Sequence, residues 1–290
     1  MIIDLVLLSI AFVALFIGSI TDIKTREVPD WLNFGLIFAA IGIRALYSVI
    51  TFDYMFLING IIGLIVFVII AYIMFYTGQW GGGDSKMLMG LGAVFGLTLA
   101  LNPFPKIGIF LINVFIAGAV YGLIYSTALA IKNRKKFVKE FLKFMHNKKI
   151  IKYRRIVLIL FIILTLLILF LIKDLIFKWI LLAFVFVIYI SFYLIFFVKA
   201  VELSSMFKYI EPSELTEGDW IAKEYKVDDK KICSPKDLGI SKKQIRQLIA
   251  LKRKGKIKTI KIKQGIPFVP SFLAALIITV IWGAWWILLF

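Results

Sequence analysis

Residues 78–86 read GQWGGGDSK, three consecutive glycines followed by one carboxylate, Asp84. Apolar runs flank this stretch on both sides, at residues 55–76 and 87–104. Each run approaches the roughly 20 residues that a transmembrane helix needs, so the stretch lies at the boundary between two predicted membrane spans. Flexible backbone beside an acid at such a boundary suits either a simple linker between helices or half of an active site.

The composition of the whole chain is that of a membrane protein. Of 290 residues, 61% are hydrophobic and 16% aromatic, and the mean hydropathy is +0.95, which exceeds what a soluble chain of this length can bury. No basic segment precedes the first apolar run, which we therefore expect to be a retained span rather than a signal peptide. The pattern predicts an all-α polytopic membrane protein with about eight transmembrane helices. The predicted spans are 2–20, 31–50, 55–76, 87–104, 107–131, 156–172, 175–198 and 267–290.

The net charge of +18 is carried mostly by Lys and Arg residues between the apolar runs. This distribution is typical of cytoplasmic loops in membrane proteins and predicts contact with membrane lipids rather than with nucleic acid. We expect the two long basic stretches, 132–155 and 199–266, to be cytoplasmic. Residues 156–198, interrupted at Lys173-Asp174, then form a tight transmembrane hairpin between them.

Counting spans back from these basic stretches predicts the side of each earlier loop. Loops 21–30 and 77–86 fall on the cytoplasmic side, and loop 51–54 falls outside. Asp22 closes the first predicted span and Asp84 opens the fourth. The two carboxylates are therefore expected on the same face of the membrane and at comparable depth.

Residues 199–266 read as a small cytoplasmic α+β module. Residues 219–234 alternate around Asp228-Asp229 like a hairpin, Ser241 is suited to cap a helix, and residues 256–263 resemble an edge strand rich in lysine. A β-β-α-β order follows. The predicted regions of the chain are a membrane catalytic core (1–131), a basic cytoplasmic loop (132–155), a transmembrane hairpin (156–198), the module (199–266) and a last transmembrane helix (267–290).

The counts of cysteine and histidine restrict the kinds of covalent cross-link and metal site that the chain can form. A single cysteine, Cys233, excludes an internal disulfide, and the single histidine, His146, leaves too few ligands for a His-rich zinc site. We expect no metal and no cofactor, so any catalysis has to rest on carboxylates.

Asp22 and Asp84 could supply that chemistry if they meet. Two carboxylates held a few Å apart share one proton, so that one acts as a base toward water while the other donates to a peptide carbonyl. The glycines Gly81, Gly82 and Gly83 would let a substrate backbone approach Asp84, and Pro29 keeps the first loop from continuing the first helix.

Three stretches carry a resemblance to a known family: TDIKTREVPDWLN (21–33), GGGDSKMLMGLGA (81–93) and GIPFVPSFLAAL (265–276). Together they resemble the type IV prepilin peptidase family of GxGD membrane aspartic proteases, especially its archaeal branch, which includes the preflagellin (prearchaellin) peptidases. The resemblance implies that Asp22 and Asp84 are the catalytic pair and that Gly81 and Gly83 are the glycines of the G-x-G-D motif.

The same resemblance implies a substrate and a location. Members of the family remove a short basic leader from pilin or archaellin precursors, just ahead of the substrate's apolar helix and at the cytoplasmic face of the cell membrane. Asp30 departs from the bacterial pattern, which usually has Asn, and the bacterial Cys-rich methyltransferase region is missing. The extra hairpin and module favour a prepilin substrate, with prearchaellin as the alternative.

Other charged residues admit more than one interpretation. Lys24, Arg26 and Lys86 could contact the substrate or simply anchor the boundary to lipid headgroups. Arg44 lies within an apolar run but toward its outer end, where its side chain could extend to the surface. An ion- or proton-coupled transporter that uses the same acids remains the alternative from a different class of function.

Overall fold

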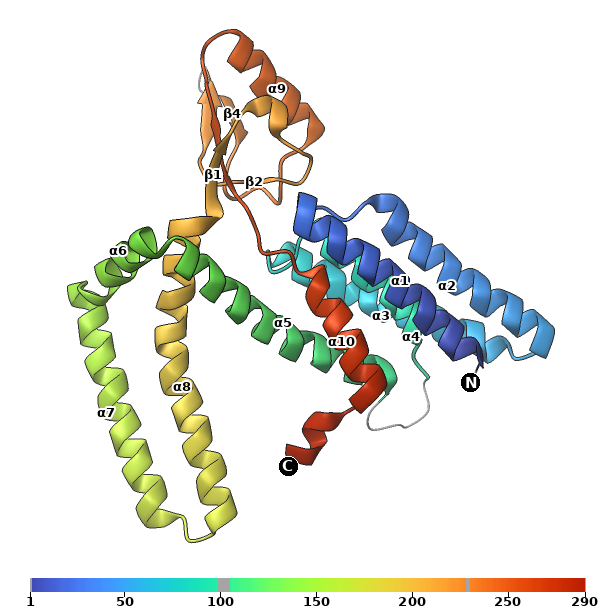
Figure 1. Cartoon of the computed structure of the whole chain (residues 1–290), viewed down its shortest axis with the longest axis horizontal. Coiled ribbons are helices and arrows are strands. Elements are labelled where there is room, and N and C mark those ends of the chain that lie inside the picture. The colour runs from blue at the N-terminus through green and yellow to red at the C-terminus, as the bar shows by residue number, and fades with distance from the viewer. Residues whose placement is uncertain (1, 99–104, 228–229, 290) are drawn as a thin grey trace. The chain divides into compact units, whose positions relative to one another are not determined.

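The structure is a computed structural model that describes residues 2–98, 105–227 and 230–289. Figure 1 shows a mostly helical chain with a small group of strands. The helices are α1 (Ile2–Thr25), α2 (Asp30–Thr51), α3 (Tyr54–Tyr76), α4 (Gly82–Phe95), α5 (Lys106–Lys132), α6 (Arg134–Met145), α7 (Lys148–Leu171), α8 (Leu175–Val201), α9 (Lys242–Arg253) and α10 (Val269–Trp282). The strands are β1 (Phe207–Ile210), β2 (Trp220–Ile221), β3 (Tyr225–Val227), β4 (Lys230–Cys233) and β5 (Ile260–Lys263).

Six helices of the described chain, α1, α2, α3, α5, α7 and α8, are long and apolar enough to cross a membrane. A helix occurs at each of the eight predicted spans, but α4 and α10 have only 14 residues each. At 1.5 Å per residue they are about 21 Å long, against roughly 30 Å for the bilayer interior. The chain is thus a multi-pass membrane protein with six candidate spans and two shorter helices. Residues 99–104 of the predicted fourth span lie outside the described residues.

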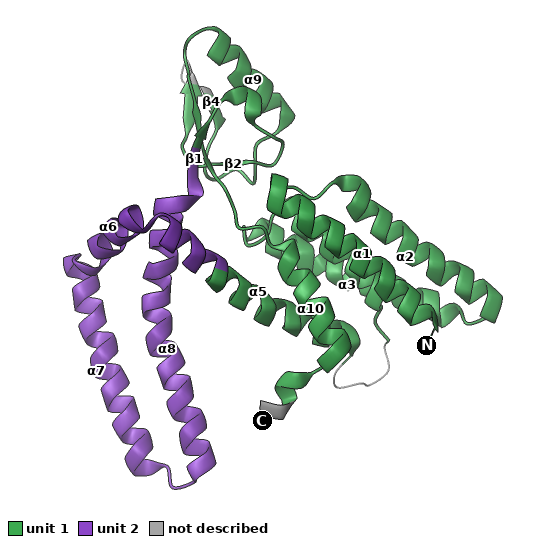
Figure 2. Ribbon diagram, viewed as in Figure 1, with its two compact units in different colours: residues 1–124, 209–290 green, residues 125–208 purple. Residues whose placement is uncertain are grey.

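The chain divides into two compact units, residues 1–124 with 209–290 and residues 125–208 (Figure 2). In the first unit, α1, α2, α3, α4 and α10 pack around one apolar core, which also receives Phe110 from α5. Glycines allow the closest approach in this bundle. A side chain at Gly63 of α3 would collide with the carbonyl oxygen of Gly92 in α4, so the two backbones touch.

The unit of residues 125–208 corrects the prediction of a basic loop at 132–155. Residues 134–145 form the helix α6, and α7 already begins at Lys148. The reason is that apolar side chains recur at helical spacing among the lysines. Phe137 packs edge-on against Phe197 with ring centroids 5.5 Å apart, and Phe144 packs against Phe196 at 5.9 Å. These contacts pack the apolar face of α6, which is partly buried, against α8.

The predicted hairpin between α7 and α8 is present, with its turn at residues 172–174. Asp174, which was expected to interrupt the apolar run, caps α8 by accepting a hydrogen bond from the backbone N–H of Phe177 at 2.7 Å.

The strands belong to the module predicted at 199–266. Strands β3 and β4 form the predicted antiparallel hairpin, and its Asp228-Asp229 turn lies outside the described residues. A second sheet has the order β1-β5-β2. The prediction that β5 is an edge strand is wrong, because β5 pairs on both sides. Its alternation explains this position, since Ile260 and Ile262 face the module's core while the lysines face outward.

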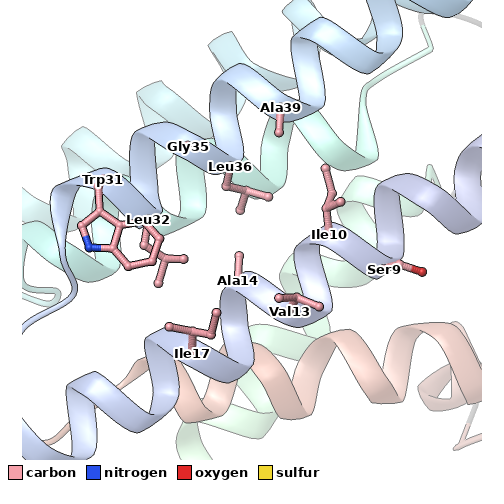
Figure 3. A pocket seen from close by; sticks show the side chains of 10 residues that line it. All are labelled: Ser9, Ile10, Val13, Ala14, Ile17, Trp31, Leu32, Gly35, Leu36 and Ala39. Carbon is pink, nitrogen blue, oxygen red and sulfur yellow. The ribbon is translucent and has the colours of Figure 1, made fainter.

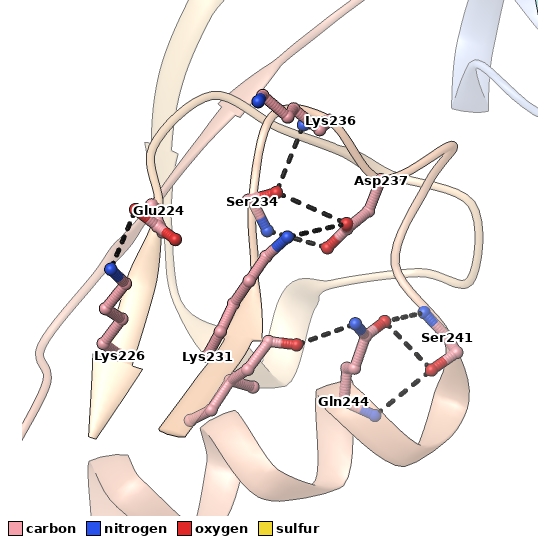
Figure 4. A network of polar contacts seen from close by, with 9 residues as sticks. Glu224, Lys226, Lys231, Ser234, Lys236, Asp237, Ser241 and Gln244 are labelled. Atoms are coloured by element: carbon pink, nitrogen blue, oxygen red, sulfur yellow. Dashed lines mark hydrogen bonds and ion pairs between the residues drawn. The ribbon is translucent and has the colours of Figure 1, made fainter. Parts of the chain in front are cut away.

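The helix of the module begins as its sequence predicts. The hydroxyl oxygen of Ser241 accepts from the backbone N–H of Gln244 at 3.4 Å, and the Gln244 side chain accepts in return from the Ser241 backbone N–H at 2.8 Å (Figure 4). The Gln244 amide also donates to the carbonyl oxygen of Ile232 at 2.7 Å. The capping pair therefore fastens α9 to strand β4.

Candidate active site

Asp22 lies in the last turn of α1 and is only 5% exposed. Its carboxylate Oδ2 accepts a hydrogen bond from the backbone N–H of Val269, the first residue of α10, at 3.0 Å. The first N–H groups of a helix have no partner within it and carry partial positive charge, so a carboxylate is favoured there. Asp22 therefore ties the end of α1 to the start of α10.

Asp84 is the third residue of α4, so it also lies at a helix N-terminus. Its Oδ2 accepts from the backbone N–H of Gly81 at 3.1 Å. A side chain at Gly81 would come within 3.2 Å of that same oxygen, which explains the need for glycine at this position. The structure differs here from the predicted loop 77–86 and the predicted span 87–104. Helix α4 already starts at Gly82, so Gly82 and Gly83 lie in its first turn.

The two motif segments touch each other next to the carboxylates. A side chain at Gly83 would lie 3.2 Å from the Cβ of Val28 and 3.3 Å from its backbone nitrogen. Val28 itself is buried. The carboxylates of Asp22 and Asp84 lie within electrostatic reach of one another, as do Asp22 and the Arg26 guanidinium. The structure therefore brings together the two acids that the sequence placed at one depth.

Such a pair has a defined chemical capacity. Two neighbouring carboxylates do not both ionise easily, so one proton is held between them. One group can then remove a proton from water while its neighbour donates one to an oxygen of the attacked group. The N-termini of α10 and α4 lie behind the two acids and favour negative charge in this place.

The other candidate residues predicted from the sequence lie on several different elements. Lys86 forms an ion pair with Asp30 at 2.6 Å, which joins the first turns of α4 and α2 at the surface. Pro29 precedes α2 directly and has an extended backbone, with φ −58° and ψ 137°. Lys24 is exposed in the last turn of α1. Gly82 has open surroundings, with Phe75 as its nearest neighbour at 3.8 Å from a hypothetical Cβ.

Arg26 holds the loop after α1 in an unusual conformation. It has φ 63°, in the left-handed region that few residues other than glycine adopt. Its guanidinium donates to the carbonyl oxygen of Gly265 at 3.2 Å. Gly265 precedes α10, so Arg26 and Asp22 both connect the first motif to the segment that leads into the last helix.

Two tryptophans pack around the loop before α4, and neither is among the candidate residues predicted from the sequence. Trp80 is buried and packs against Phe268 and Phe272 with centroid distances of 5.6 and 5.3 Å, which anchors the loop before α4. Trp220 of the module lies over Gly78, whose hypothetical Cβ would be 3.1 Å from the indole ring. Gly78 has φ 70°, a backbone conformation that favours glycine, and the indole ring leaves little room for a side chain at this position.

Arg44 is the largest departure from the sequence-based interpretation. It does not extend to the surface: it is 4% exposed and lies between α2 and the C-terminal end of α4. Its guanidinium donates to the carbonyl oxygens of Ala93 at 2.8 Å, Val94 at 2.8 Å and Phe56 at 2.7 Å. The last carbonyls of a helix have no partner within it, so Arg44 supplies the missing donors.

Metal binding has no support in the part of the chain that the structure describes, which holds no group of three or more His, Cys, Asp or Glu side chains placed for an ion. The single cysteine, Cys233, is buried in the module, and burial raises the pKa of its thiol to about 11. The two acids remain the chemically distinctive groups of the site.

Comparisons with known proteins give matches to part of the chain. Residues 9–124, which contain both acids, match the type IV leader peptidase family. The chain is 35% identical over 158 residues to a preflagellin peptidase of Methanococcus maripaludis, covering 48% of this chain and 66% of the relative. A preflagellin peptidase of Methanococcus voltae is 33% identical over 139 residues, covering 45% and 59%. A third, from Methanocaldococcus jannaschii, is 37% identical over 82 residues, covering 28% and 35%. The match thus spans less than two thirds of each relative, and no solved structure matches the chain.

Proposed function

Residues 9–124 of this chain belong to the type IV leader peptidase family, and from this premise we propose that the protein is a membrane aspartic endopeptidase whose catalytic pair is Asp22 and Asp84. The observation that carries the proposal is the convergence of these two acids. They come from separate helices, lie within electrostatic reach of one another and sit at the N-termini of α10 and α4. Paired carboxylates in this arrangement are suited to peptide hydrolysis.

In the proposed reaction, the pair holds one proton between its two acids. The ionised carboxylate takes a proton from a water molecule, and the oxygen of that water attacks the carbonyl carbon of the scissile peptide bond. The protonated carboxyl donates its proton to the carbonyl oxygen. When the C–N bond breaks, the first acid gives its proton to the leaving nitrogen, and a hydroxyl of the tetrahedral intermediate gives its proton to the second acid as the new carboxyl group forms, so that the pair again holds one proton. Gly82 has open surroundings and leaves room for the substrate backbone near Asp84, whereas Gly83 packs against Val28.

The proposed substrates are precursors with a short basic leader followed by an apolar helix, of the prepilin or prearchaellin kind. The relatives that match are named preflagellin peptidases, which favours prearchaellin-like precursors over the prepilin substrate expected from the extra hairpin and module. Cleavage is proposed at the cytoplasmic face of the membrane, where the leader would remain during insertion.

A pH series on purified protein tests the chemistry. With a synthetic peptide that spans a Lys-Gly or Arg-Gly leader junction, cleavage is expected to follow a bell-shaped pH profile whose two apparent pKa values belong to the pair of acids. EDTA is expected to leave the rate unchanged. Inhibition by EDTA would end the aspartic interpretation, and a protein that transports ions with these acids would leave the peptide intact.

Cysteine labelling tests the proposed side of the site. Thr25, Gln79 and Asp53 are all exposed. Cysteines at positions 25 and 79 are expected to react with an impermeant maleimide only from the cytoplasmic side, and a cysteine at position 53 only from outside. The buried Cys233 gives little background, because its raised pKa leaves few thiolates near neutral pH. Labelling of 25 and 79 from opposite sides would refute the shared face.

A further inference from the structure

Each acid of the candidate site is held by a backbone N–H group from another segment. The N–H of Val269 at the start of α10 donates to Asp22 at 3.0 Å, and the N–H of Gly81 just before α4 donates to Asp84 at 3.1 Å. A hydrogen bond of this length restricts both the distance and the direction of its partners. The place of each carboxylate therefore depends on the place of its donor.

An aromatic residue directly precedes each donor in the chain. Trp80 precedes Gly81, and Phe268 precedes Val269. Because a peptide unit is planar and rigid, the backbone of each aromatic residue sets the direction of the N–H that follows it. The two rings pack against each other, with centroids 5.6 Å apart and an angle of 35° between their planes. The residues next to the two donors are thus in direct contact.

Neighbouring residues fix both rings in place. Trp80 is only 6% exposed. The ring of Phe272, about one turn further along α10, meets Trp80 at 5.3 Å and Phe268 at 5.5 Å, both in an edge-on arrangement. A side chain at Gly118 of α5 would collide with the ring of Phe268, so this glycine leaves the room that the ring occupies. We call Trp80, Phe268 and Phe272 the aromatic bridge, because they join the segment before α4 to the segment before α10.

The bridge bears on the chemistry through the distance between the acids. Asp22 and Asp84 lie within electrostatic reach of one another, and two carboxylates share a proton only while they are held a few Å apart. Their two donors are set in place by backbone segments that touch through Trp80 and Phe268. A shift of either ring would move one donor relative to the other.

We propose that Trp80 and Phe268 are positioning residues of the catalytic pair: the packing of their rings fixes the two backbone donors relative to one another, and the donors hold Asp22 and Asp84 at the separation at which they share a proton. This inference rests on the proposed peptidase function. Neither ring takes part in the chemical step itself.

The sharpest test adds one methyl group beside the bridge. Gly118→Ala displaces the ring of Phe268 without removing any apolar side chain. With the leader-junction peptide as substrate, kcat is expected to fall about 10- to 100-fold, the scale for misplacing catalytic groups by about 1 Å, while KM stays within about twofold. Gly122→Ala is the matched control one turn further along α5, because its added side chain meets nothing within 4 Å, and it is expected to leave kcat unchanged.

Removal of the rings tests the same contact without overpacking. Trp80→Leu and Phe268→Leu are each expected to lower kcat on the same scale. The double variant is expected to be hardly worse than either single variant, because both remove one shared contact. Trp80→Phe keeps an aromatic ring at this position and is expected to restore most of the lost kcat.

Two further variants control for the loss of an aromatic side chain as such. Phe67→Leu alters a ring that is 1% exposed in the same core, and it is expected to lower Tm but not kcat. Trp31→Leu removes an indole that is 67% exposed and lines an apolar groove of about 370 Å³ between α1 and α2 (Figure 3). This groove lies on the outward face of α1, whereas Asp22 lies on its core-facing side, so kcat is expected to stay unchanged.

The pH profile separates positioning from a general loss of stability. Carboxylates that lie further apart repel each other less, so the two limbs of the bell-shaped profile are expected to move closer together in Gly118→Ala. A variant that is only less stable has less active protein, which lowers the rate without narrowing the bell. Arg26, which also lies within electrostatic reach of Asp22, is unchanged in all of these variants.

The outcomes distinguish this proposal from the peptidase proposal. Wild-type kcat in Gly118→Ala and in both leucine variants of the bridge would overturn the positioning role and leave the peptidase proposal standing. An equal fall of kcat in Phe67→Leu would also overturn it, since any loss of core packing would then have the same effect. A wild-type protein that cleaves no leader-junction peptide would overturn both proposals.

Discussion

Replacement of Asp22 or Asp84 with Asn is expected to abolish precursor cleavage, with a loss of at least about 10³-fold in kcat/KM, because Asn can neither accept the proton of water nor share a proton with its neighbour. The double variant is expected to be hardly worse than either single variant, since two groups that act as one unit lose their function together. A gel shift between precursor and mature product, from co-expressed protein or from proteoliposomes, measures the effect.

Asp30→Asn is the matched control for these variants. Asp30 lies in a motif segment but is exposed, and its partner is Lys86 rather than either catalytic acid. An exposed ion pair contributes at most about 1 kcal/mol, so this variant should fold and cleave nearly as the wild type does. Retained processing in Asp22→Asn or Asp84→Asn would refute the catalytic pair.

Replacement of Arg44 with Leu is expected to lower the free energy of unfolding by about 1–3 kcal/mol or more, the range for leaving a buried acceptor without its hydrogen-bond partner. The carbonyl oxygens of Ala93 and Val94 at the end of α4 would lose their donor in a buried place, and the carbonyl oxygen of Phe56 would lose its additional one. Thermal unfolding of the purified protein in detergent, followed by circular dichroism, measures the loss as a fall in Tm.

Arg44→Lys separates the charge of this side chain from its geometry. A lysine keeps the positive charge but not the planar fork that reaches several carbonyls at once, so an intermediate stability is expected. Lys86→Leu is the control at the other end of α4, where the ion pair is exposed and the expected change is small. An Arg44→Leu protein as stable as the wild type would show that the three contacts contribute nothing.

The positions of α1, α2 and α3 could be predicted from sequence because each is a long apolar run with a clear boundary. The start of α4 could not. Glycine disfavours helix in general, so the prediction began this span at Met87, whereas the helix begins at Gly82. Glycine destabilises the first turn of a helix less than the interior, and the negative charge of Asp84 stabilises the N-terminus of α4.

Charge counting and parity, which are properties of whole loops, predicted that Asp22 and Asp84 share one face of the membrane at comparable depth, but they left open whether the two acids meet. The contact that holds Asp22 could not be predicted, because it joins distant parts of the chain. Val269 donates to Asp22 from 247 residues away, and the place of β5 in its sheet likewise depends on strands far apart in sequence. Neither pairing leaves a local pattern that a reading of neighbouring residues could detect.

The position of Arg44 has a consequence for the biogenesis of the protein. The chain emerges from the ribosome in order, and two carbonyl partners of Arg44 lie 49 and 50 residues later. An arginine in the middle of an inserting helix costs about 2.5–3.5 kcal/mol. Arg44 on α2 thus gains these two partners only when α4 joins it, so the segment that brings Asp84 also completes the hydrogen bonds of a buried arginine.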